Sequence, residues 1–217
     1  MDGITHISSV LSAPWIAWVM LALMGCAVFA EWFQPGVILQ APSSFFARTD
    51  RTYREAPVNN QGQLLMLLFR LGTIAMMIFL CLCPAQHASM AAYGVIFGGL
   101  LVLLLVKKLL NLLIDYTFIL TRRFGSFHEP YVDLVTMVSV LLYPALLVLV
   151  RLGIPSAAEW VAWGAAALFF VLWAYRMART YVVSLAAPIY LLMYFATVEV
   201  LPLAGLIYLS GKIMTLI

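Results

Sequence analysis

Long apolar runs separated by short polar segments dominate the pattern of hydrophobic and polar positions along the chain. A helix rises 1.5 Å per residue, so about 20 apolar residues cross the ~30 Å hydrocarbon core of a bilayer. Runs of this kind cover residues 15–33, 64–83, 90–106, 131–150, 160–175 and 187–209. The pattern predicts an all-α, polytopic transmembrane helix bundle of about six spans, forming a single integral-membrane domain over residues 1–217.

Two segments outside these runs are also expected to be helical. The apolar period of the third run continues through Phe118 and Ile119, and no Pro or Gly follows until Gly125. This pattern predicts that the third helix extends to about residue 122, projecting from the bilayer or lying along it. Residues 43–54, between the first two runs, could form a short helix on the membrane surface.

Composition supports lipid as the solvent of this chain. Hydrophobic residues make up 65% of the 217 residues, and charged residues make up only 10%. Soluble domains are about half apolar and about a quarter charged. The first eleven residues contain no Lys or Arg, whereas a secretory signal peptide begins with positive charge. The first apolar run is therefore expected to remain in the mature protein.

The distribution of Lys and Arg predicts the orientation. Nine lie in the segments on one side of the predicted membrane: Arg48, Arg51, Arg54, Lys107, Lys108, Arg122, Arg123, Arg176 and Arg179. The opposite side has only Arg151 and Lys212. Cytoplasmic loops carry the excess of positive residues. We expect a bacterial inner-membrane protein with both termini in the periplasm.

Ionisable residues inside the predicted spans are candidate sites, because each costs about 2.5–3.5 kcal/mol at the centre of a span on insertion scales. Glu199 lies near the middle of the sixth run, three residues before Pro202. It could bind a proton or cation beside a helix break, or it could be a buried structural residue. We favour the structural role, with Arg70 as the leading partner. Arg70, in the second run, could instead extend its side chain to the membrane surface.

A second group of polar residues follows the third run. Lys107, Asn111 and Asp115 recur at intervals of four, and Lys108 flanks them. Such a stripe could bind a lipid headgroup or a phosphate. We favour a solvated helix face, because a helix leaving the bilayer needs one.

Other features suggest packing rather than chemistry. Gly94 and Gly98 form a G-x-x-x-G pair that could allow close helix packing, and the tryptophans cluster towards span ends as interfacial anchors do. The chain contains no Walker motif, no G-x-S-x-G and no H-E-x-x-H. We therefore expect no enzyme activity, no cofactor, no metal and no nucleic-acid partner. The expected partners are the bilayer and other membrane-protein subunits.

The last third of the chain carries a recognisable segment from Tyr194 through Glu199 to Pro202. It resembles the closing signature of domain-of-unknown-function family 4271. The basic stretch at residues 46–54, the helix with Lys107 and Lys108, and residues 141–144 are also similar. The chain departs from the family in having Ala196 where a cysteine is usual. The resemblance implies a Bacteroidetes-type inner-membrane protein and supplies no activity.

Three functions fit these features. The favoured one is a non-catalytic subunit or assembly factor of a cell-envelope complex, in protein export or envelope biogenesis. The alternatives are a small transporter or lipid-handling protein that uses Glu199, and a membrane enzyme acting on lipids. Convergence of the polar span residues around a water-filled cavity would favour transport.

Overall fold

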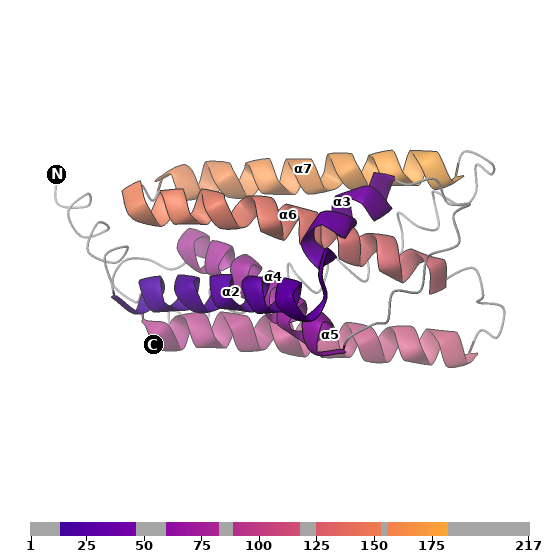
Figure 1. Ribbon diagram of the computed structural model, residues 1–217, viewed down its shortest axis with the longest axis horizontal. Helices are drawn as coiled ribbons and strands as arrows, with labels where there is room; N and C mark the ends of the chain where they lie inside the picture. Colours follow the sequence, from indigo (N-terminus) through magenta and orange to yellow (C-terminus); the bar gives the residue numbers. More distant parts are fainter. Residues whose placement is uncertain (1–13, 47–59, 83–88, 118–124, 153–155, 182–217) are drawn as a thin grey trace.

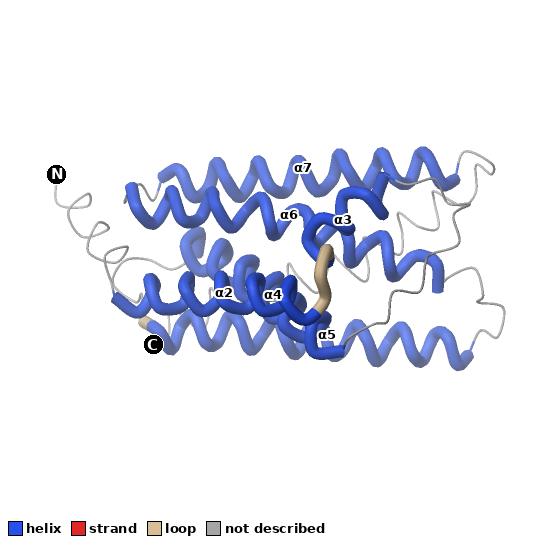
Figure 2. The backbone as a smooth tube through the Cα atoms, in the orientation of Figure 1, coloured by secondary structure: helices blue, strands red, loops and turns tan. Residues whose placement is uncertain are grey.

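The described part of the protein is a bundle of helices. The computed structural model describes residues 14–46, 60–82, 89–117, 125–152 and 156–181. In these ranges every element is helical (Figures 1 and 2). The helices are α2 (Pro14–Phe33), α3 (Val37–Phe46), α4 (Asn60–Leu82), α5 (Met90–Thr117), α6 (Gly125–Leu152) and α7 (Ser156–Tyr181).

Five of these helices are long and apolar enough to cross a membrane, which confirms the all-helical, multi-pass architecture. The candidate spans are Pro14–Phe33, Asn60–Cys81, Met90–Leu109, Val132–Arg151 and Ala157–Tyr175. Each has 19 to 22 residues, and therefore a length of about 30 Å. The predicted sixth span, residues 187–209, lies outside the described residues.

Several helices begin earlier than expected, among them α6, which begins at Gly125 rather than at residue 131. The short helix after the first span begins at Val37 rather than at residue 43, and the rest of its expected range, residues 47–54, lies outside the described residues. It begins early because the Glu31 carboxylate accepts hydrogen bonds from the backbone N–H groups of Gly36 and Ile38, which caps the first turn. Gly36 has a φ of 88°, a conformation that glycine adopts without strain.

Another difference is the length of the fifth span helix. α7 continues through Arg176 and Arg179 to Tyr181, whereas these arginines were expected in a loop. Residues 174–181 contain no Pro or Gly, so nothing in the sequence stops the helix. α5, α6 and α7 all extend beyond the C-terminal end of α2, on the side where α3 lies (Figure 1).

α4 is the central helix of the bundle. It contacts α2, α5, α6 and α7, and it crosses behind α2 in Figure 1. Half of its span is buried within the protein, compared with 6% of the α7 span. Because lipid is as apolar as a leucine side chain, exposed apolar faces such as that of α7 are expected in a membrane.

Glycine allows α2 and α4 to approach closely. A Cβ atom on Gly72 would lie 2.2 Å from Cδ2 of Leu23, and one on Gly62 would lie 3.0 Å from Cβ of Gln34. A Cβ on Gly94 or Gly98 would meet no described atom within 4 Å. Among the described helices, close packing therefore occurs at α4 glycines rather than at the predicted G-x-x-x-G pair.

Aromatic rings join α2, α4 and α5 at one end of the bundle. The ring centroids of Trp15 and Phe79 are 5.4 Å apart, and both rings lie about 6 Å from Tyr93. Trp15 was expected to be an interfacial anchor, but it packs against these two rings and is half-buried. In contrast, Trp18, Trp32, Trp160 and Trp163 are largely exposed.

Tyrosine hydroxyls provide polar links between helices. The Tyr143 hydroxyl on α6 donates to the Met20 carbonyl of α2 at 2.8 Å, and the Tyr93 hydroxyl donates to the Gly72 carbonyl at 3.4 Å. Hydrogen bonds between membrane helices contribute about 0.6 kcal/mol on average and at most about 1.7 kcal/mol. The shorter bond is expected to be the stronger.

We expect Tyr143→Phe to lower the free energy of unfolding by about 1 kcal/mol, because the change removes only the hydroxyl. The measurement is unfolding by SDS in mixed micelles. Tyr93→Phe is the matched comparison and is expected to have a smaller effect, since its bond is 0.6 Å longer (3.4 Å against 2.8 Å). Equal effects would contradict the assignment of these two bonds.

Candidate functional site

Arg70 is the ionisable residue for which the structure gives the clearest geometry. It lies on α4, and its Nε donates to the carbonyl of Met66 at 3.1 Å. Met66 is one turn closer to the N-terminal end of α4, so the side chain runs back towards that end of the span. This is the direction expected for a side chain that extends towards the membrane surface.

The Arg70 guanidinium also reaches α6. Its Nη1 donates to the Val132 carbonyl at 3.4 Å, and the adjacent Asp133 carboxylate is close enough to interact with it electrostatically. Val132 is the first residue of the α6 span. Arg70 therefore joins the middle of α4 to the beginning of the α6 span.

Three further polar residues lie buried on the same two helices. Thr136 and Ser139 follow Asp133 at intervals of three on α6, and Thr73 follows Arg70 by three on α4; all three are at most 4% exposed. The Thr136 hydroxyl donates to the Val132 carbonyl at 2.7 Å, and the Thr73 hydroxyl donates to the Phe69 carbonyl at 2.8 Å. Within the described part of the chain, the Ser139 hydroxyl has no hydrogen-bond partner. We call Arg70, Thr73, Asp133, Thr136 and Ser139 the α4–α6 polar cluster.

The bonding of the polar cluster fits a structural role. Both threonine hydroxyls bond to the carbonyl four residues earlier in their own helix, which is the usual way to satisfy a hydroxyl in a membrane span. The Arg70 donors go to backbone carbonyls of two helices. A guanidinium keeps its proton at physiological pH, so Arg70 can supply a fixed positive charge but cannot relay protons. The arrangement can hold α4 and α6 in register.

The remaining predicted candidates are placed only in part. Lys107 is half-buried and Lys108 is exposed on α5. Asn111 and Asp115 lie on the same unbroken helix as the two lysines, but their side chains are outside the described part of the structure. Glu199 also lies outside the described residues, so its pairing with Arg70 stays a prediction.

The structure does not bring Lys107 to Arg70. Tyr93 of α5 lies opposite Gly72 of α4, which is two residues from Arg70. Lys107 is 14 residues further along α5 (107 minus 93), about 21 Å at 1.5 Å per residue. The predicted candidates therefore divide into at least two separate locations.

Sequence reasoning missed most of the polar cluster. Asp133, Thr136 and Ser139 share one face of α6, and this spacing is visible in the sequence as a polar stripe in an apolar run. Asp133 was not among the residues predicted from the sequence. Among the described residues, no three His, Cys, Asp or Glu side chains gather as a metal site would require.

One known family matches nearly the whole chain. The model of one family, described as "Domain of unknown function (DUF4271)", matches residues 16–209. No curated protein and no solved structure matches the chain. The match covers the five described spans from residue 16 onward, together with the segment around Glu199 that carries the resemblance in the sequence. The chain therefore belongs to the DUF4271 family of membrane proteins.

Proposed function

We propose that this protein is a non-catalytic subunit or assembly factor of an inner-membrane complex of the cell envelope, in protein export or envelope biogenesis. The observation that supports this proposal best is the bonding of Arg70. Its two hydrogen bonds go to backbone carbonyls of α4 and α6, so the most prominent ionisable residue of the described spans serves helix association. The sequence adds no catalytic motif.

The alternative of a small transporter depends on Glu199 and on a polar cavity. The polar cluster of α4 and α6 is packed between helices, and two of its hydroxyls bond to carbonyls of their own helices. A transport pathway needs ionisable groups that exchange ligands or protons with water. The bonding of this cluster therefore favours the subunit over the transporter.

The proposal is tested by purifying the tagged, full-length protein from its native membrane in mild detergent. The expected result is a discrete complex in which the 24.1 kDa chain and one or more membrane proteins are present in fixed ratio. Quantitative mass spectrometry of the complex measures that ratio. A stable protein that carries no other protein in stoichiometric amount would contradict the proposal.

The orientation is part of this proposal. We expect both termini in the periplasm and Asn60 at the cytoplasmic surface, because nine of the eleven Lys and Arg residues outside the span interiors lie on one side. Reporter fusions at Asn60 and at Ile217 measure this directly. A cytoplasmic Ile217 together with a cytoplasmic Asn60 would show that the number of spans is not six. A cytoplasmic Ile217 with a periplasmic Asn60 would show that the orientation is inverted.

A further inference from the structure

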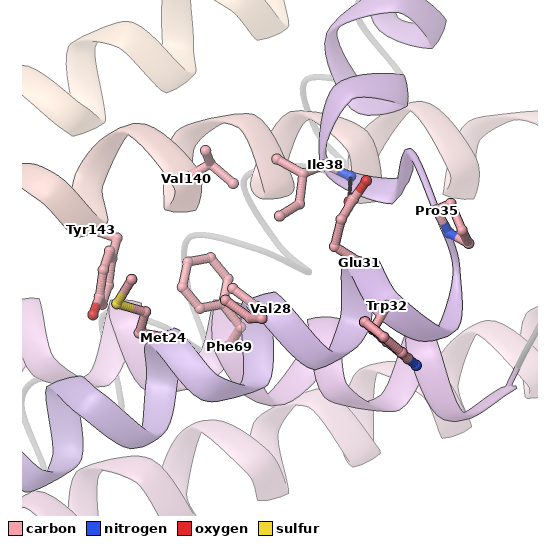
Figure 3. A pocket seen from close by; sticks show the side chains of 10 residues that line it. Met24, Val28, Glu31, Trp32, Pro35, Ile38, Phe69, Val140 and Tyr143 are labelled. Carbon is pink, nitrogen blue, oxygen red and sulfur yellow. Dashed lines mark hydrogen bonds between the residues drawn. The ribbon is translucent and has the colours of Figure 1, made fainter.

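A groove opens between α2 and α6, in the part of the bundle nearest α3. It has a volume of about 640 Å³ and is lined mainly by apolar side chains. Met24, Val28 and Trp32 of α2 form one wall, Val140 and Tyr143 of α6 form the other, and Phe69 of α4 forms the floor (Figure 3).

The two ends of the groove differ in polarity. At one end, the Tyr143 hydroxyl bonds to the Met20 carbonyl and ties α6 to α2. At the other end, Glu31 and Ile38 lie beside the turn into α3 (Figure 3). Glu31 is the one charged residue among the ten that line the groove. The groove therefore runs from an apolar closed end to an acidic end.

The length of the groove and the position of its acidic end match one leaflet of a bilayer. From Met24 to Trp32 the α2 wall rises eight residues, about 12 Å at 1.5 Å per residue. Half of a ~30 Å hydrocarbon core is about 15 Å. The acidic end coincides with the C-terminal end of the α2 span at Phe33, where headgroups begin. A lipid of that leaflet can thus place its acyl chain along the groove and its headgroup at Glu31.

Shape and charge indicate the occupant. A helix is about 10 Å wide with its side chains. An acyl chain is much thinner, and filling the groove restores dispersion contacts that a void would lose. The Glu31 carboxylate accepts two backbone hydrogen bonds, and a carboxylate has about four acceptor sites. The Glu31 carboxylate therefore has acceptor sites left for hydrogen bonds from an ammonium group.

We propose that this groove binds one acyl chain of a phospholipid whose headgroup carries a primary ammonium, with that ammonium at Glu31. The site holds a bilayer lipid between α2 and α6 and does not depend on the proposed subunit role. The site is expected to prefer this lipid over bulk lipid only modestly, because the acyl chain moves from one apolar environment to another.

The test uses the full-length protein in phosphatidylcholine vesicles with a small fraction of phosphatidylethanolamine that carries a diazirine on its acyl chain. After illumination, mass spectrometry locates the adducts. We expect Met24, Val28 and Tyr143 to be labelled about fivefold more than Phe170 and Val171 of the exposed α7 face, a preference of about 1 kcal/mol. Equal labelling of the two regions overturns the proposal.

Variants test the shape of the groove. Val140→Trp places an indole in the groove and should reduce labelling there to the level of α7. Val28→Phe serves the same purpose if the first variant does not fold, since Val28 is 55% exposed and tolerates added volume. Val171→Trp on α7 is the matched control and should leave groove labelling unchanged. Undiminished labelling in both groove variants overturns the proposal.

Two further measurements identify the headgroup and exclude other occupants. Phosphatidylglycerol with the same label should react less than phosphatidylethanolamine, and Glu31→Gln should remove that difference. Equal or stronger labelling by phosphatidylglycerol in the unaltered protein overturns the headgroup assignment.

A Val28→Cys variant without its native cysteines should form no disulfide with a second copy or with cysteines introduced in residues 187–209. Efficient cross-linking to either one shows that protein fills the groove, and overturns the proposal.

Discussion

Arg70→Met should lower the free energy of unfolding by about 2–3 kcal/mol, the largest effect that we expect from a single polar substitution in the described spans. The change removes both hydrogen bonds of the guanidinium and a positive charge that interacts with the Asp133 carboxylate. Removing one of two interacting, half-buried charges is destabilising, because the other charge stays behind. SDS unfolding in mixed micelles measures the loss.

A double-mutant cycle identifies the partner of Arg70. If Asp133 is the partner, Arg70→Met combined with Asp133→Asn should be more stable than Arg70→Met alone, with a coupling energy of about 1 kcal/mol or more. The cycle with Glu199→Gln tests the predicted pairing of Glu199 with Arg70: a coupling energy of about 1 kcal/mol would support it, and additivity to within about 0.5 kcal/mol would contradict it. Coupling to Glu199 but not to Asp133 would contradict the pairing between α4 and α6. Arg151→Met, at the exposed end of α6, is the matched control and should have little effect.

Gly72→Ile should destabilise the protein by about 1–3 kcal/mol through overpacking between α2 and α4. The new Cβ alone would lie 2.2 Å from Cδ2 of Leu23, a buried side chain that is only 6% exposed. Leu23 must therefore move, together with the surface of α2 that it holds against α4. The same SDS titration measures the effect.

Two comparisons make the Gly72 result specific. Gly72→Ile should be partly rescued by Leu23→Ala, which removes the atoms that the new side chain meets. Gly94→Ile adds the same volume on α5, where no described atom lies within 4 Å of the new Cβ, and should change stability by less than about 0.5 kcal/mol. A large loss at Gly94 with none at Gly72 would contradict the helix packing described for α2 and α4.

The sequence predicts the all-helical membrane architecture well, because apolar length is a direct consequence of bilayer thickness. The first span was placed within one residue of α2, which begins at Pro14 and ends at Phe33. The helix after it begins earlier than expected, since its start depends on Glu31, a side chain of the preceding helix that caps the backbone of Gly36 and Ile38. The sequence pattern around residues 43–54 could not predict this cap, because Glu31 lies outside that segment.

The candidate site was predicted less completely than the fold. Arg70 was found because a charge in an apolar run is conspicuous, and its side chain does run back along α4 towards the end of the span. Its link to Val132 was not found, because the sequence does not say which helices are neighbours. Among the described helices, close packing occurs at Gly72 rather than at Gly94 and Gly98, and the deciding feature is Leu23 on another helix.

The central claim is that the ionisable residues of the α4–α6 polar cluster hold helices together rather than carry out chemistry. The most direct test is the double variant Arg70→Met with Asp133→Asn, expressed in the native membrane. If the cluster is structural, neutral side chains of similar volume can replace the two interacting charges, so we expect near-normal abundance and an undiminished fraction of the protein in its native complex. Normal abundance with loss of the complex, or with the phenotype of a deletion, would contradict the claim.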